Sequence, residues 1–301
     1  MNNFLKTLKY FDQKARQNLI FDIQKKYDFV FTEILGQSYC KRDILAMKIG
    51  NQENACLLVG GVHGMEWLTS LLLLSFLDTV CQSIKYHYKI YDIDLKSLIY
   101  KRGVCFVPCL NPDGTEISIH GSTSAKNYAA LVKEISNGNT KTWQANARGV
   151  DLNHNFDAKW QELNILEKQE GILGPSKTRF GGQSPESEIE TQILVNFCKK
   201  NNYRHAIAFH SQGEEIYWSF GENKPENSFL LASLFSNLSS YKLSQPEGLA
   251  VGGGFKDWFI EKFNRPAFTI EIGKGKNPLP ISDFPSIYER LEKMLVFSII
   301  S

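Results

Sequence analysis

Residues 57–67 read LLVGGVHGMEW and join an apolar run to a histidine and, three positions later, a glutamate. The apolar part, residues 55–60, has the length of a buried strand and ends in two glycines. If a helix begins near Glu66, positions i and i+3 share one face, and the His63 and Glu66 side chains can converge on one cation. A surface pair without function is the alternative interpretation of these two residues.

Along the rest of the chain, the periodicity predicts strands that alternate with helices. We therefore expect one α/β domain over residues 1–301, with a mixed, twisted sheet, helices on both faces and an N-terminal extension (1–45) packed on it. The polar, Gly-rich segment 115–183 predicts long loops around a site. The expected elements are strands at 55–60, 103–109, 205–209 and 266–272, a turn at 111–114, and helices at 66–83, 184–200, 227–240, 255–263 and 281–300.

Two later strands also carry groups that suit a metal site. The run HAIAFHSQG brings His210 to the end of a strand, as happens with His63. Two histidines and a glutamate with room for water are a ligand set of catalytic zinc sites. Glu271 lies within the apolar run PAFTIEI, so it either pairs with a basic side chain or faces a cavity where proton transfer is possible.

Seven motifs in order give the chain a specific resemblance. It resembles the zinc carboxypeptidases of the carboxypeptidase A/B type, particularly their short bacterial branch of murein peptide amidases and γ-D-glutamyl-diaminopimelate peptidases. The motifs are HGMEW (63–67), NPDG (111–114), NARGVDLNHNF (146–156), FGGQSPESE (180–188), His210-Ser211, Asp257-Trp258 and FTIE (268–271).

The resemblance implies a role for individual residues. His63, Glu66 and His210 would ligate one Zn²⁺ per chain, and Glu271 would be the general base. Asp151 would accept a hydrogen bond from the free ring nitrogen of His63 and fix its tautomer. A loop aspartate that caps its own backbone is the alternative for Asp151.

An oxyanion-stabilising cation is also expected from the resemblance, and Arg148 is the candidate for it. The expected substrate-binding residues are Asn153, His154, Ser211 and Lys256.

The chain departs from the family at positions that choose the substrate. His154 stands where the family usually has an arginine, and an imidazole cannot grip a carboxylate with two parallel bonds. Leu249 aligns with the tyrosine that closes over substrate in digestive members. Lys256 stands at the position that sets the floor of the specificity pocket in the family. The resemblance thus implies that it would favour an acidic substrate, unless it turns to solvent. These departures favour carboxylate-rich peptides, such as those released from cell walls.

Composition excludes several classes of protein. Hydrophobic residues make up 43% of the 301 residues, and the formal net charge is +2, which is ordinary for a folded globular chain. A near-neutral balance gives no reason to expect nucleic acid or an anionic membrane as partner. We see no signal peptide or membrane-spanning run, and the six dispersed cysteines suit reduced core thiols better than a disulfide or metal pair. A cytoplasmic location is therefore expected.

The sequence thus predicts a zinc-dependent hydrolase that cleaves a peptide or γ-D-glutamyl amide bond. Peptides, including muropeptides, are the expected partners. Two alternatives stay open: a zinc-dependent deacylase of the aspartoacylase or succinylglutamate desuccinylase type, and a zinc-free binding module that has kept the fold.

Overall fold

The computed structural model describes residues 8–301, so the first seven residues of the expected N-terminal extension lie outside it. Eight strands form one mixed sheet in the order β1-β2-β4-β3-β5-β8-β6-β7. The four central strands, β4, β3, β5 and β8, run parallel, whereas β2 and β6 pair antiparallel with this central group. The strands are β1 Phe31–Gln37, β2 Asp43–Ile49, β3 Cys56–Val59, β4 Val104–Val107, β5 His205–His210, β6 Glu215–Tyr217, β7 Lys242–Ser244 and β8 Ala267–Glu271.

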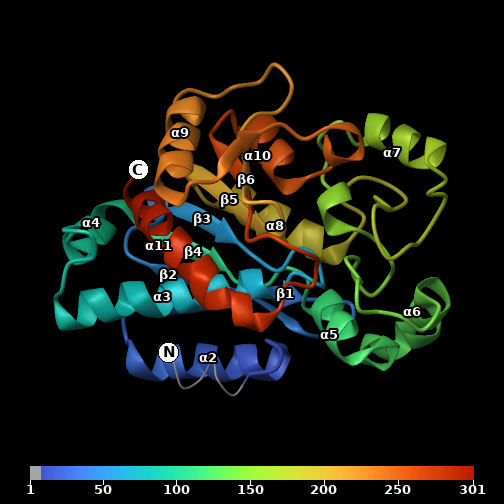
Figure 1. Cartoon of the computed structure of the whole chain (residues 1–301), viewed down its shortest axis with the longest axis horizontal. Coiled ribbons are helices and arrows are strands. Elements are labelled where there is room, and N and C mark those ends of the chain that lie inside the picture. Colours follow the sequence, from blue (N-terminus) through green and yellow to red (C-terminus); the bar gives the residue numbers. More distant parts are fainter. Residues whose placement is uncertain (1–7) are drawn as a thin grey trace.

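Helices cover both faces of the sheet, which confirms the predicted α/β class (Figure 1). The α-helices of the described part are α2 Gln13–Lys26, α3 Leu68–Tyr86, α4 Leu95–Arg102, α5 Pro112–His120, α6 Ala129–Ser136, α7 Trp160–Gln169, α8 Ile189–Lys200, α9 Ser228–Ser239, α10 Phe255–Phe263 and α11 Phe284–Ile300.

Alternation along the central strands creates two hydrophobic cores. In β3, Cys56 and Leu58 face one core, which α3, α4, α9 and α11 cover and on which α2 packs from outside. Leu57 and Val59 face the opposite core, which α8 and α10 cover. All four β3 residues are fully buried, as expected for a central parallel strand.

Helix α3 lies deep in the first of these cores. It is the one helix of residues 8–301 with the length and hydropathy of a membrane span, and 78% of its most apolar window is buried inside the fold. All six cysteines are also buried, and none forms a disulfide.

The segment 115–183 differs from the long loops we expected, because it contains most of α5 and all of α6 and α7. The expected turn 111–114 is the start of α5: the Asn111 side chain accepts the Gly114 N–H at 2.8 Å, and Pro112 occupies the first turn. Helix α8 begins at Ile189 instead of Ser184. Asn155 accounts for this difference, since its side chain binds Ser184 O and Glu188 N and holds the intervening residues outside the helix.

Candidate metal centre

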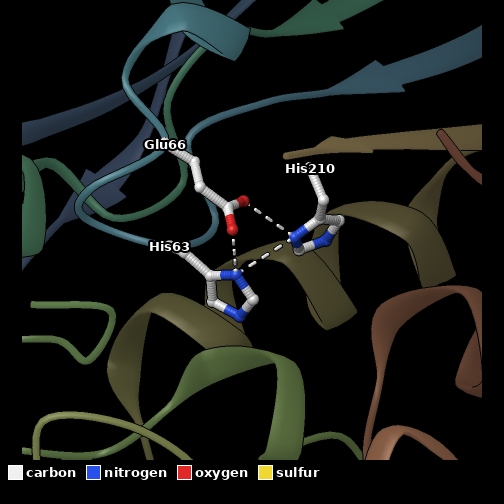
Figure 2. A group of neighbouring side chains, drawn as sticks. All are labelled: His63, Glu66 and His210. Carbon is white, nitrogen blue, oxygen red and sulfur yellow. Dashed lines mark hydrogen bonds and ion pairs between the residues drawn. The ribbon is translucent and has the colours of Figure 1, made fainter. Parts of the chain in front are cut away.

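Three side chains from distant parts of the chain converge above the central strands (Figure 2). His63 lies in the loop after β3, Glu66 lies in the last turn before α3, and His210 is the final residue of β5. Parallel neighbours β3 and β5 end at the same edge of the sheet, and this edge is where open α/β sheets bind ligands.

Close backbone packing fixes the loop that carries His63. A Cβ on Gly64 would lie 2.3 Å from the carbonyl oxygen of Gly114, so only glycine fits there. The Asn111 amide donates to Val62 O, Gln144 O and Ala145 O, each at 3.1 Å. The motifs HGMEW and NPDG therefore depend on each other through direct contact.

The spacing of the donor atoms fits a zinc ion. Glu66 Oε1 lies 2.9 Å from His63 Nδ1, Glu66 Oε2 lies 3.1 Å from His210 Nδ1, and the two Nδ1 atoms are 3.2 Å apart. Ligands about 2.0 Å from the centre of a tetrahedron are about 3.3 Å apart, so these separations match three ligands of one zinc ion. The predicted trio is thus assembled as the resemblance implies.

Neighbouring charges shift the pKa values of Glu66 and His63 strongly. Burial opposes ionisation of Glu66, but His63 and His210 outweigh it and lower the pKa of Glu66 to about 2. Burial likewise opposes protonation of His63, yet Glu66 and Asp151 together raise its pKa well above the usual value. Glu66 is therefore a carboxylate at neutral pH, which is the form that binds a cation.

Asp151 holds the other side of the His63 ring. Its Oδ1 lies 3.1 Å from His63 Nε2, and its Oδ2 accepts the Arg179 N–H at 2.9 Å. Burial raises the pKa of Asp151, but the opposing effect of His63 and His154 is larger, so this pKa lies well below its usual value. Asp151 also accepts from Asn153 N, so the capping role considered as an alternative exists together with the contact to His63.

Glu271 lies at the same edge, in a cleft of about 630 Å³ that His63 and His210 also line. It is the register partner of His210 across β5 and β8, and it is only half-buried. Burial raises the pKa of Glu271 well above its usual value, and Glu66 adds to the effect. The carboxyl group thus faces the cleft beside the proposed ligands, and it is not sealed in the core.

Three of the predicted substrate-binding residues line the cleft. Asn153 uses its side-chain oxygen to accept the Phe255 N–H at 3.1 Å. His154 Nδ1 lies 2.8 Å from the fully buried Glu167 carboxylate. Lys256 is buried and forms an ion pair with Asp257, and it also donates to Ser219 O at 2.7 Å. The Lys256 side chain is therefore turned inward, but its charge is already compensated.

Arg148 and Ser211 are not among the residues that line the cleft. The Arg148 guanidinium donates to Tyr39 Oη at 2.7 Å and lies 3.8 Å from Glu188. Ser211 Oγ donates to Asn277 Oδ1 at 2.8 Å. Both side chains have protein partners in this structure, and their roles toward substrate stay predictions.

A buried acidic group lies next to Arg148. The Asn146 amide donates to Glu188 at 2.7 Å and to Glu190 at 3.2 Å, which joins the two carboxyl groups. Glu190 is fully buried, and its second oxygen has no partner among the described residues. Burial, with a smaller effect of Asp113, raises the pKa of Glu190 to about 8. Glu190 is thus mostly protonated at neutral pH.

The sequence reasoning missed several cleft residues. These are Gln144, Thr178, Arg179 and Tyr217. Glu167, which lies behind His154 and does not line the cleft, was also missed. Arg179 offered a signal, because it stands immediately before the recognised FGGQSPESE motif and is one of only two arginines in segment 115–183. The resemblance drew attention to Arg148, the other arginine.

Comparison with known sequences gives a consistent result. Residues 18–293 match the sequence family described as zinc carboxypeptidase. The chain is 31% identical over 281 residues to the γ-D-glutamyl-L-diamino acid endopeptidase 1 of Lysinibacillus sphaericus, covering 93% of this chain and 69% of that protein. It is also 28% identical to bovine carboxypeptidase O over 215 residues, which covers 68% of this chain and 52% of that protein.

Solved structures share the fold. Bovine thrombin-activatable fibrinolysis inhibitor, solved in complex with tick carboxypeptidase inhibitor, superposes with a TM-score of 0.74 at 20% identity and covers 96% of each chain. Murein-tripeptide amidase of Escherichia coli O157 gives a TM-score of 0.52 at 20% identity and covers 89% of each chain.

Proposed function

Because this chain belongs to the zinc carboxypeptidase family, we propose that it is a zinc-dependent hydrolase that cleaves γ-D-glutamyl amide bonds in cell-wall-derived peptides. The observation that carries this proposal is the meeting of His63, Glu66 and His210 in one cleft with Glu271. The similarity to a γ-D-glutamyl-L-diamino acid endopeptidase supports the substrate class.

His63, Glu66 and His210 would hold the zinc ion. When bound, zinc would lower the pKa of a water molecule from about 15.7 towards 7. Asp151 accepts from the remote ring nitrogen of His63, which directs Nδ1 toward the metal and keeps the ring in one orientation.

Glu271 would act as the general base and then as the general acid. Its carboxylate lies on the strand next to His210, where it can accept the proton of the attacking water. The same proton would then pass from Glu271 to the leaving amine. The raised pKa brings this carboxyl group closer to the operating pH, which favours transfer in both directions.

The cleft also suits a substrate that carries carboxylates. Lys256 and His154 line it, although Asp257 and Glu167 pair with them. Arg179 also lines the cleft, and among residues 8–301 it has no acidic partner, so its charge supports a substrate that carries carboxylates.

The test compares three classes of substrate with zinc-loaded protein. We expect release of the diamino acid from L-alanyl-γ-D-glutamyl-diaminopimelate, measured by chromatography, and much slower cleavage of a plain C-terminal dipeptide. Cleavage of the dipeptide but not the tripeptide would contradict the γ-glutamyl specificity. Cleavage of N-acetylaspartate alone would favour the deacylase alternative, and a protein that binds no stoichiometric zinc would be a binding module.

A further inference from the structure

Three side chains that can carry positive charge line the cleft besides the proposed ligands: His154, Arg179 and Lys256. Two of them have acidic partners, since Lys256 pairs with Asp257 and His154 with Glu167. Arg179 differs. Within residues 8–301 its guanidinium makes no hydrogen bond and has no carboxylate within the 4.0 Å limit of an ion pair, although Glu170 and Glu247 line the same cleft.

The backbone of Arg179 is anchored directly beside the metal centre. Its N–H donates to Asp151 Oδ2 at 2.9 Å, and Asp151 Oδ1 lies 3.1 Å from His63 Nε2. The next residue, Phe180, accepts the Asp151 N–H at 2.8 Å. One residue, Asp151, therefore separates the Arg179 backbone from the ring of His63.

The residues before Arg179 are held as well. Lys177 O accepts the N–H groups of Gln144 and Ala145, and Thr178 Oγ1 donates to the Gln144 side chain. Arg179 itself has φ = +68°, a left-handed conformation that is unfavourable for a non-glycine residue. The fixed neighbours on both sides keep Arg179 in this conformation.

An arginine in this position can do what His154 cannot. The guanidinium is planar, always charged and able to bind a carboxylate with two parallel hydrogen bonds. The His154 ring uses one nitrogen for Glu167, so it can offer at most a single donor to the cleft.

We propose that Arg179 is the substrate-binding side chain that holds a free carboxylate next to the scissile amide bond. This inference rests on the proposed function, which supplies the amide substrate. It makes Arg179 a specificity-determining residue, and it assigns the recognition of carboxylate to the loop that also supports Asp151.

The test uses L-alanyl-γ-D-glutamyl-L-lysine and two forms of it, with the lysine or the glutamyl α-carboxylate converted to an amide. On the unmodified peptide, we expect Arg179→Gln to lower kcat/KM roughly 10- to 100-fold, mainly through KM, since a hydrogen bond to a charged group is lost. Arg179→Lys should recover part of this loss, because it restores charge but not the bidentate geometry. With the amide form that lacks the carboxylate bound by Arg179, wild type and Arg179→Gln should have the same kcat/KM.

The control is Lys177→Gln, which removes one exposed positive charge from the same loop without touching the cleft lining. It should leave all three kcat/KM values unchanged. If Arg179→Gln lowers turnover of all three peptides equally, Arg179 only supports Asp151 and the inference is wrong.

A binding measurement separates this result from failure of the proposed function. If wild-type protein cleaves none of the peptides, calorimetry with the zinc-loaded Glu271→Gln protein compares binding of the acid and amide forms. Weaker binding of one amide, with the difference lost after Arg179→Gln, would support Arg179 even though the γ-glutamyl hydrolase proposal had failed. Equal binding of all forms would overturn the inference.

Discussion

His210 and Glu271 are direct register partners at the ends of the parallel strands β5 and β8. Neighbouring strands lie about 4.8 Å apart, and partner side chains point to the same face. The sheet therefore sets the separation of a proposed ligand from the proposed base, without help from any flexible loop. Four predictions follow the proposed roles and the surrounding packing.

Glu271→Gln should retain zinc and the fold but lower kcat by at least roughly 10²–10⁴-fold, because the amide cannot accept a proton. Steady-state kinetics with parallel zinc analysis would measure this. Glu222→Gln, which removes an exposed carboxylate, serves as the matched control and should be fully active. Turnover retained by Glu271→Gln would place the base elsewhere.

His63→Ala should lose both stoichiometric zinc and activity, because two remaining ligands cannot form the site. Zinc content after dialysis, measured by atomic emission, is the direct readout. His87→Asn is the control: His87 is exposed and caps α3 with φ = +57°, which asparagine tolerates. Full zinc content in the His63→Ala protein would exclude the ligand role.

Glu190→Gln should become more stable relative to wild type as the pH rises from 5 to 8. Folded Glu190 has a pKa of about 8, whereas an unfolded glutamate titrates near 4.3, so between these values the folded state alone holds the proton. Wild-type stability therefore falls through this window, and glutamine removes that loss. We expect the difference, measured by urea unfolding, to grow by a few kcal/mol.

A second variant is the control for the urea unfolding of Glu190→Gln. Glu162→Gln changes an exposed carboxyl group and should keep a constant offset from wild type across the pH range. A constant offset for Glu190→Gln as well would show that Glu190 is ionised in the folded protein.

Gly181→Ala should destabilise the protein by about 1–3 kcal/mol, because an added Cβ would lie 2.6 Å from His154 O and 3.0 Å from the Glu167 carboxylate. Gly174→Ala is the matched control, since a Cβ there meets nothing within 4 Å. Urea unfolding of both variants measures the difference. Equal stability would mean that the His154–Glu167 pair relaxes freely.

Much of the sheet was predictable because buried parallel strands are continuous apolar runs. The expected strand at 205–209 and helix at 255–263 agree closely with β5 and α10. Strands β1 and β2 were not predicted, because they lie toward one edge of the sheet and alternate irregularly between buried and exposed residues. The helices within 115–183 were not predicted for a related reason. Polar residues and glycines are frequent in this segment, so its sequence pattern does not reveal the hydrophobic contacts that stabilise these helices.

The proposed ligands were predictable because each follows an apolar strand, and strands of one sheet end together. The surroundings of Arg148 were not predictable. Its surroundings, Tyr39 and Glu188, come from remote segments whose contact no local pattern reveals. The partners of Lys256 and His154 show the same limit: sequence identified the cations, but not the carboxylates that compensate them.

The chain leaves the sheet at Val107 and returns only at His205, and this excursion supplies His154 and Arg179 to the cleft. By contrast, His63, Glu66, His210 and Glu271 are attached to strands β3, β5 and β8 or to the turns beside them. Evolution can thus lengthen, shorten or rewrite the excursion and redirect the choice of substrate while Asp151 is retained. The proposed reacting centre, which is attached to the sheet itself, would stay unaltered by such changes.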